Sequence, residues 1–234
     1  MSWDGEQNVQ APRLMTFSEI KMIKDLNKPE FIKNFFTGEK KINFGWKECE
    51  DALNKSIFYK NLEIIDNVSK SKVQLSLLES YWFDKILDIK EISNLISVNS
   101  FVLLNMSAYN NSLSSVCGYI ENQFNCQADV HIYGGLNTHC KSFKIHNDSP
   151  NNLIVQLEGT CEWFIYNERI NHSINLDSDE NLTLVIKTVL EPGDAIFIPK
   201  NQLHRCNPLS KRISASIPFF GNFVSKRGWI NLEA

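Results

Sequence analysis

The sequence lacks the features that mark secreted, membrane-spanning and phosphate-binding proteins. Its six cysteines include no C-x-x-C pair, and its first residues do not join a basic segment to an apolar one, so we expect a cytoplasmic protein with reduced thiols. No apolar run approaches the roughly 18 residues of a membrane span, and we expect no membrane partner. Glycine-rich phosphate loops, a G-x-S-x-G elbow and zinc-type cysteine pairs are also missing.

Neither sign of charge dominates the chain, and its length limits the number of domains. The net charge is -3 and the isoelectric point is about 6.0, so nucleic acid is not a favoured partner on charge grounds. With 43% apolar residues, the 234 residues can bury one sizeable core. We expect one structural domain, in which residues 1–127 form an N-terminal region of mixed helices and strands that packs on a core of residues 128–234.

The spacing of apolar residues changes from helical to strand-like near residue 127. Before this point the spacing predicts helices over residues 18–26, 46–53, 72–85 and 112–125, with Ser112 as a candidate N-cap and a pair of strands as the alternative for parts of this half. After it, we expect eight strands, over residues 128–133, 142–146, 153–157, 162–167, 182–189, 195–198, 204–207 and 212–219. Short strands separated by turn residues are typical of an all-β barrel or sandwich.

One motif in the second half has the spacing of a metal site. His146 and Asp148 stand two residues apart at the end of a predicted strand, so their side chains point to the same face. An imidazole and a carboxylate placed in this way supply two of the three ligands of a facial triad, which leaves coordination positions of Fe(II) open. Downstream, a Pro-Gly-Asp turn at 192–194, a strand and Pro199 lead to His204, which can supply the third ligand from a neighbouring strand.

In type and order these residues resemble the JmjC-like or cupin-like oxygenases that depend on Fe(II) and 2-oxoglutarate. The resemblance covers residues 128–220 and extends more weakly upstream; its landmarks are His146-Asn147-Asp148, residues 153–159 followed by Trp163, residues 192–194, His204, residues 28–33 and Trp46. It implies a mainly β chain with a helical N-terminal region (α+β), folded as a double-stranded β-helix of the cupin or jelly-roll type. It also implies a dioxygenase that holds Fe(II) through the catalytic residues His146, Asp148 and His204, with 2-oxoglutarate and O2 as co-substrates.

The chain departs from this family at the position that usually anchors 2-oxoglutarate. A Lys or Arg normally stands fifteen residues after the first histidine and pairs with the distal carboxylate, whereas this chain has Cys161. A thiol cannot replace the cation, because a buried unpaired carboxylate is costly. Arg212, with Ser214 on the same strand face, resembles the R-x-S pair of other 2-oxoglutarate oxygenases and is the preferred anchor. Lys144, on the face of His146, is the second candidate.

Two more side chains are candidates for cofactor contact. Tyr133 is placed to donate its hydroxyl to the distal carboxylate, and Asn152 matches a position that contacts the proximal carboxylate in some relatives. Structural interpretations stand beside these: Arg212 and Lys144 as solvated charges at strand ends, Tyr133 and Trp163 as core aromatics.

The substrate and the assembly stay open at this level. The resemblance favours hydroxylation of a protein side chain or a similarly bulky substrate. The alternatives are a small-metabolite or nucleoside hydroxylase, and a non-catalytic cupin that only binds a ligand or partner, which the cysteine at position 161 would fit. Only fourteen residues follow Phe220, so we expect a monomer or a barrel-mediated dimer rather than dimerisation through a C-terminal helical domain.

Overall fold

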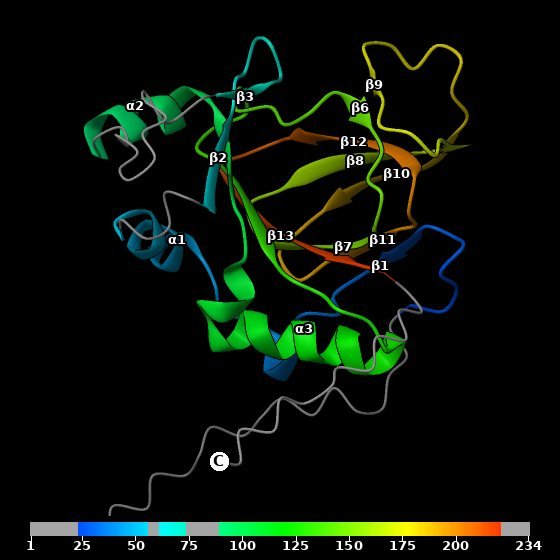
Figure 1. Ribbon diagram of the computed structural model, residues 1–234, viewed down its shortest axis with the longest axis horizontal. Helices are drawn as coiled ribbons and strands as arrows, with labels where there is room; N and C mark the ends of the chain where they lie inside the picture. Colours follow the sequence, from blue (N-terminus) through cyan, green and yellow to red (C-terminus); the bar gives the residue numbers. More distant parts are fainter. Residues whose placement is uncertain (1–22, 56–60, 74–88, 221–234) are drawn as a thin grey trace, which may run out of the picture.

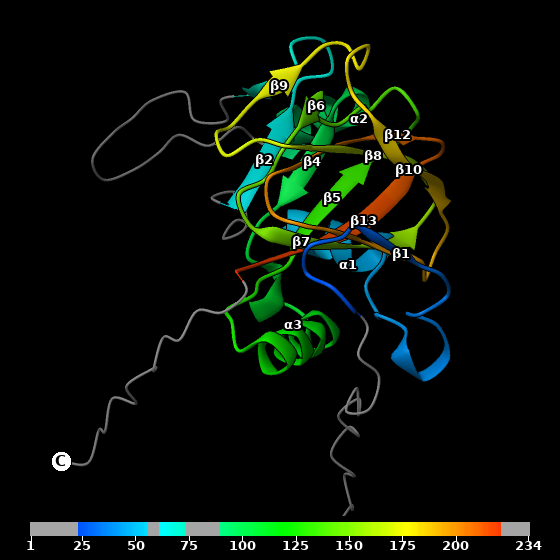
Figure 2. The same ribbon diagram turned by 90° about the vertical axis from the view of Figure 1, so that its right-hand side faces the viewer.

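Two antiparallel β-sheets face one another in the computed structural model, which describes residues 23–55, 61–73 and 89–220 (Figure 1). The larger sheet has eight strands in the order β1-β11-β7-β13-β5-β4-β2-β3, and the smaller has five in the order β10-β8-β12-β6-β9. A view turned by 90° shows α3 below the larger sheet, on the side away from the smaller one (Figure 2). This is the predicted mainly β arrangement of a jelly-roll barrel.

Strands from both halves of the sequence share the larger sheet. Its members are β1 (Glu30–Ile32), β2 (Leu62–Ile65), β3 (Lys72–Val73), β4 (Ser100–Leu103), β5 (His131–Gly135), β7 (Asn151–Glu158), β11 (Ala195–Ile198) and β13 (Arg212–Phe219). The smaller sheet contains β6 (Ile145–His146), β8 (Cys161–Arg169), β9 (Asn175–Leu176), β10 (Leu184–Leu190) and β12 (Gln202–Pro208). Three α-helices are described: α1 (Trp46–Leu53), α2 (Ile89–Val98) and α3 (Asn111–Phe124).

Apolar and polar side chains alternate along β13 of the larger sheet, so the two faces of the sheet have different surroundings. On β13, Ile213, Ala215 and Ile217 belong to the core that the sheet forms with the helices, whereas Arg212, Ser214 and Ser216 line a pocket between the sheets. A second apolar cluster lies between the sheets, made of Ile154, Cys161, Trp163, Ile165, Leu190, Ile196 and Ile198. One face of the sheet therefore stabilises the fold, and the other presents polar side chains to the interior.

The eight predicted strands are all present, with ends that differ by a few residues, and the helix predicted over 46–53 is confirmed as α1. The helix predicted over 72–85 is wrong at its start, because Lys72 and Val73 pair with β2 as β3; the rest lies outside the described residues. The helix predicted over 18–26 is absent from residues 23–26, and its earlier part is not described. The short strand β9 was not predicted.

The N-cap of α3 also differs from the prediction. The side chain of Asn110, rather than that of Ser112, accepts hydrogen bonds from the first backbone N–H groups, those of Ser112 and Leu113. Asn is as favourable an N-cap as Ser, and the cap lies two residues earlier than predicted, so the helix begins at Asn111. No helix in the described ranges is both long and apolar enough to cross a lipid bilayer.

Candidate metal and cofactor site

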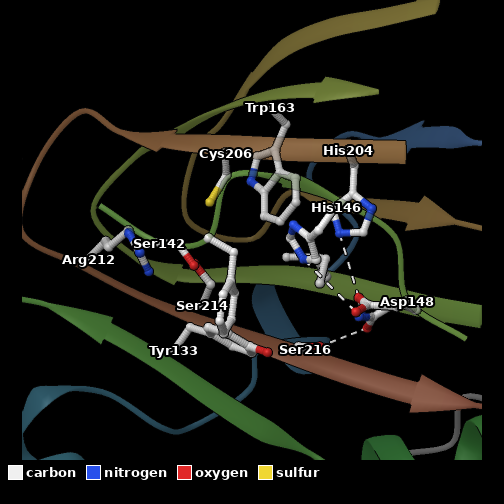
Figure 3. Close-up of a pocket in the computed structure, with 13 residues that line it drawn as sticks. Tyr133, Ser142, His146, Asp148, Trp163, His204, Cys206, Arg212, Ser214 and Ser216 are labelled. Carbon is white, nitrogen blue, oxygen red and sulfur yellow. Dashed lines mark hydrogen bonds and ion pairs between the residues drawn. The ribbon is translucent and has the colours of Figure 1, made fainter. Parts of the chain in front are cut away.

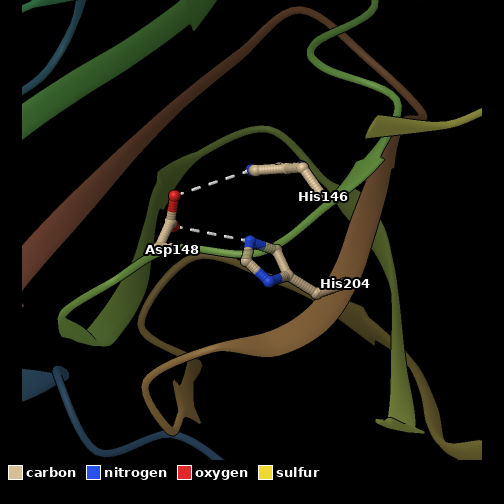
Figure 4. Close-up of side chains that lie close together, drawn as sticks. All are labelled: His146, Asp148 and His204. Carbon is tan, nitrogen blue, oxygen red and sulfur yellow. Dashed lines mark ion pairs between the residues drawn. The ribbon is translucent and has the colours of Figure 1, made fainter. Parts of the chain in front are cut away.

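Strand pairing brings the two predicted histidine ligands together. In the ladder between β6 and β12, His146 lies directly opposite His204, and their ring centroids are 4.3 Å apart. Asp148 follows β6, and its carboxylate faces both rings (Figure 4). Its Oδ1 lies 3.9 Å from His146 Nε2, and its Oδ2 lies 3.6 Å from His204 Nε2. The three ligand atoms all lie within 4.8 Å of one another, as donors around a single ion would.

Backbone carbonyl groups fix the orientation of both imidazoles. His146 Nδ1 lies 2.8 Å from the carbonyl oxygen of Lys144, and His204 Nδ1 lies 2.9 Å from that of Gln202. Each Nδ1 therefore carries the proton that it donates to the carbonyl, which leaves the Nε2 lone pair directed at the centre of the site. Two imidazoles and one carboxylate form the donor set of a facial triad, which suits Fe(II).

The electrostatic surroundings keep these groups in the forms that bind a metal. His204 is 2% exposed, and burial, followed by the neighbouring His146, lowers the pKa of His204 to about 4. Burial opposes ionisation of Asp148, yet His204, His146 and the amide of Asn152 outweigh it and hold the pKa of Asp148 below its usual value. At neutral pH His204 is neutral and Asp148 is ionised, so neither has to lose a proton when a cation binds.

Asn152 lies beside the triad, at the carboxylate ligand. Its Nδ2 donates a hydrogen bond to Asp148 Oδ2 at 3.3 Å, and its Oδ1 accepts one from Ser216 Oγ at 2.8 Å. The amide N–H of Asn152 contacts the carboxylate of Asp148, and contact of Asn152 with the proximal carboxylate of 2-oxoglutarate stays a prediction. The three side chains form a chain of hydrogen bonds from β13 through β7 to the triad.

A pocket between the sheets extends from the triad to Arg212 (Figure 3). Its lining combines the triad with polar side chains of the larger sheet and aromatic side chains of both walls: Tyr133, Ser142, Phe143, His146, Asp148, Asn152, Ile154, Trp163, His204, Cys206, Arg212, Ser214 and Ser216. Of the predicted anchors, Arg212, Ser214 and Tyr133 line the pocket and Lys144 does not. Lys144 forms an ion pair of 2.5 Å with Asp177 and is 37% exposed.

Arg212 is a buried cation without a counter-ion in the described part of the chain. It is 1% exposed, and its Nε and Nη2 atoms have no hydrogen-bond partner among the described residues. A buried unpaired guanidinium is costly, and a carboxylate is the group that satisfies it with two parallel hydrogen bonds. The residues present therefore fit 2-oxoglutarate, with one end at the triad and the distal carboxylate at Arg212.

The other two predicted anchors are arranged differently from Arg212. The hydroxyl of Ser214 donates to Gln156 Oε1 at 2.9 Å, so its proton is already used. Tyr133 lines the pocket, and burial raises the pKa of its hydroxyl, which stays a neutral donor.

Cys161 lies on β8 of the smaller sheet and is fully buried. The thiol of Cys161 contacts the thiol of Cys206. This contact raises the pKa of Cys161 and lowers the pKa of Cys206 to about 7. Burial raises the pKa of both thiols, and the nearby Arg212 lowers the pKa of both. The position that usually carries the cation thus holds a small thiol near a guanidinium that comes from β13. Arg212 is a buried cation that lines the same pocket.

Several pocket residues were not identified from the sequence. Trp163 was interpreted as a core aromatic, and it belongs to the core cluster and lines the pocket as well. Ser142, Phe143 and Cys206 were not predicted to line the pocket. Cys206 lies two residues from His204 on β12, so period-2 alternation is a signal that would have found it. Ser142 and Phe143 lie between β5 and β6, in a segment that was predicted as part of a strand over 142–146; the alternation that places His146 inside also places Ser142 on that face.

The fold and the site define a double-stranded β-helix protein with a His-Asp-His cluster that could hold a metal and a buried arginine in the same pocket. The family model described as "JmjC domain" matches residues 103–226, which is more than half of the chain. The chain therefore belongs to the JmjC family, and the predicted membership among the Fe(II) and 2-oxoglutarate dependent oxygenases is confirmed.

Curated relatives share this part of the sequence. The bifunctional lysine-specific demethylase and histidyl-hydroxylase NO66 of Drosophila simulans is 28% identical over 113 residues, which are 45% of this chain and 13% of the relative. Ribosomal oxygenase 1 of Danio rerio is 27% identical over 113 residues, 45% of this chain and 21% of the relative. The chain thus matches about a fifth or less of the length of these relatives.

Among solved structures, that of the Escherichia coli ribosomal oxygenase YcfD in complex with cobalt and 2-oxoglutarate is similar in fold. It is 16% identical, with a TM-score of 0.58, over 84% of this chain and 49% of the YcfD chain. A second structure, titled as the X-ray structure of Escherichia coli YcfD, has a TM-score of 0.56 at 16% identity, over 85% of this chain and 51% of that chain. These likenesses concern the fold.

Proposed function

We propose that this chain is an Fe(II)/2-oxoglutarate dependent dioxygenase that hydroxylates a side chain of a protein. The observation that carries the proposal is one pocket that holds both a three-ligand metal site and a buried guanidinium without a partner. A metal triad alone would fit many cupins. Arg212, in the same pocket, favours an anionic ligand that extends from the metal site to the guanidinium. 2-Oxoglutarate is an anion with a carboxylate at each end and fits this description.

The residues of the chain divide the work between metal and co-substrate. His146, Asp148 and His204 would hold Fe(II), and Arg212 would bind the distal carboxylate through a two-pronged hydrogen bond. When bound, Fe(II) and 2-oxoglutarate supply the activation of O2 that hydroxylation of a C–H bond requires. The surrounding wall, with Ile154 and Trp163 among its members, excludes water from the reacting groups.

The position of Arg212 weighs against the non-catalytic alternative. That alternative was based on Cys161, which suggested that the capacity to bind 2-oxoglutarate is lost. Arg212 is a buried cation in the same pocket, which supports an anchor that does not depend on a Lys or Arg at position 161. The names of the relatives, a histidyl-hydroxylase and a ribosomal oxygenase, favour a protein substrate over a small metabolite or nucleoside.

Two measurements on the full chain test the activity. Anaerobic calorimetry with Mn(II) in place of Fe(II) should detect binding of 2-oxoglutarate, and His204→Ala should abolish it together with metal binding. With Fe(II), ascorbate and O2, the wild type should convert 2-oxoglutarate to succinate and His204→Ala should not. Absence of 2-oxoglutarate binding would contradict the proposal, and binding without succinate formation would identify a ligand-binding cupin.

The substrate class needs a separate test. Ribosomal proteins and a pool of nucleosides and metabolites are incubated with wild-type protein or with His204→Ala, and both fractions are analysed by mass spectrometry. We expect a gain of one oxygen atom on a protein side chain, with the wild type only. A gain confined to the small molecules would favour the small-substrate alternative.

A further inference from the structure

Buried donors without partners are concentrated in the pocket. In the described part of the chain, four buried side-chain polar atoms have no hydrogen-bond partner: Gln123 Oε1, Trp163 Nε1, Arg212 Nε and Arg212 Nη2. The last three are all N–H donors, and their two residues line the same pocket; Gln123 lies on α3. Trp163 therefore resembles Arg212, the proposed anchor, in having a buried N–H donor without a partner.

The chemistry of these three atoms restricts what can satisfy them. An indole N–H and a guanidinium N–H only donate, so their common partner must be an acceptor. Unsatisfied buried donors are rare in native proteins, because each costs free energy that a neighbouring group or a ligand normally recovers. A carboxylate has two oxygens and about four lone-pair positions, which is enough for three donors.

The position of Trp163 directs its N–H to one part of the pocket. Trp163 lies on β8 opposite Cys206 of β12, and its ring stacks on that of His204, with centroids 6.1 Å apart and planes inclined by 28°. Trp163 is 7% exposed. Figure 3 shows its indole nitrogen on the side of Cys206 and Arg212, with the six-membered ring toward His146. The N–H thus faces the end of the pocket where the distal carboxylate would lie.

We propose that Trp163 is a second anchor of 2-oxoglutarate, whose indole N–H donates to the distal carboxylate beside the guanidinium of Arg212. This inference rests on the proposed function, since it names a further residue of the same co-substrate site. The guanidinium supplies charge, and the indole supplies a neutral donor of fixed direction. The stacked His204 ring and the β8–β12 ladder hold that donor in place before the co-substrate arrives.

Calorimetry with Trp163→Phe tests the contact. Phenylalanine keeps an aromatic ring against His204 and removes the N–H. On the Mn(II)-loaded full chain, we expect the Kd of 2-oxoglutarate to rise about tenfold or more, the loss that follows removal of one hydrogen bond to a charged group. The Kd of Mn(II) alone should not change. Trp46→Phe is the matched control, because Trp46 packs on Phe101 away from the pocket and should leave both constants unchanged.

A shorter acid separates the two ends of the co-substrate. The ligand 2-oxobutanoate keeps the 2-oxo acid group and lacks the distal carboxylate, so its Kd should be equal for the wild type and Trp163→Phe. An equal loss for both acids would place the contact elsewhere and overturn the inference, as would an unchanged Kd for 2-oxoglutarate. If the wild type itself binds no 2-oxoglutarate, the proposed function fails as well, which makes the two failures distinguishable.

Nuclear magnetic resonance observes the contact in the wild-type protein. The chain has five tryptophans, so indole nitrogen-15 spectra contain few signals. On the Zn(II)-loaded protein, 2-oxoglutarate should move the Trp163 indole proton downfield, and 2-oxobutanoate should not. The signal is assigned with Trp163→Phe or, if that variant does not fold, with Trp163→Tyr. A Trp163 signal that 2-oxoglutarate leaves in place would exclude the hydrogen bond.

Discussion

Ser216 determines which end of the Asn152 amide faces the metal site. Its hydroxyl donates to Asn152 Oδ1 at 2.8 Å, so the amide N–H group points at Asp148 Oδ2. The two ends of an amide have almost the same shape, and only their partners distinguish them. Two residues earlier on the same strand face, Ser214 makes a similar bond of 2.9 Å to Gln156, whose amide donates to the carbonyls of Glu158 and Ile213.

These two serines form a matched pair for mutagenesis. We expect Ser216→Ala to weaken Mn(II) binding by about tenfold, because the carboxylate ligand loses the support of an oriented donor. Ser214→Ala should not change it, since Gln156 leads to backbone rather than to a ligand. Calorimetry without 2-oxoglutarate measures both values. Equal Mn(II) affinities in the two variants would mean that Ser216 does not orient Asp148.

A second prediction concerns the two candidate cations. Arg212→Met should weaken 2-oxoglutarate binding by about a hundredfold or more, because the buried carboxylate loses its charged partner. Lys144→Met should have no such effect, since Lys144 pairs with exposed Asp177. Without co-substrate, Arg212→Met should not lower the free energy of unfolding and is expected to raise it by about 1 kcal/mol, as the unpaired charge is removed. Anaerobic calorimetry and urea unfolding provide the measurements, and unchanged 2-oxoglutarate affinity would remove Arg212 from the site.

A third prediction compares position 161 on β8, where relatives carry a cation, with Arg212 on β13. Cys161→Lys places a second positive charge near Arg212 in a buried position, and we expect a loss of about 2 kcal/mol or more in the free energy of unfolding. The double variant Cys161→Lys/Arg212→Ala has one cation again and should recover part of that stability and bind 2-oxoglutarate more tightly than Arg212→Ala alone. Urea unfolding and calorimetry of the four proteins compare these effects. Additive losses in the double variant would show that the two positions do not share one role.

The pH dependence of stability follows from His204. In the metal-free fold its pKa is about 4, against 6.5 for an unperturbed histidine. Between these pH values the unfolded chain binds a proton that the folded chain does not, so the free energy of unfolding decreases as the pH falls from 6.5 to 4, by about 3 kcal/mol at most. Asp148, with its lowered pKa, adds to the loss only below pH 3.8.

Urea unfolding in EDTA across this range measures the effect. His204→Gln removes the titrating imidazole and should show a smaller decrease than the wild type. The same decrease in both proteins would assign the pH dependence to other groups.

The part of the fold that the sequence predicts best is the part with clear period-2 patterns. The alternation on β13 and the His-x-Asp spacing after β6 each place side chains on a known face, so Arg212, His146 and Asp148 could be assigned to the interior. By contrast, a pair of strands was only an alternative for parts of the N-terminal half, and β2 and β4 were not located. β4 is buried throughout and β2 nearly so, and their apolar runs show no alternation. The predicted N-cap of α3, Ser112, was wrong because residues 110–112, Asn-Asn-Ser, all suit that position.

The chemistry of the site was only partly readable from sequence. Residue types and spacing identify ligands, whereas the satisfaction of a donor depends on what surrounds it in space. Trp163 illustrates the limit: an indole in a strand packs in a core in most proteins, and only the coordinates reveal that its N–H lacks a partner. Lys144 illustrates the converse, because its place on the face of His146 did not bring its amine into the pocket.

The direct pairing of His146 with His204 ties the chemistry of the centre to the alignment of two strands. β6 has only two residues, and a slip of one residue against β12 would turn its imidazole to the opposite side of the sheet. A misaligned chain could therefore keep most of its backbone ladder and still lose tight binding of a divalent ion. Tight binding of a divalent ion therefore requires this alignment, and a bound ion would stabilise the aligned form relative to a slipped one.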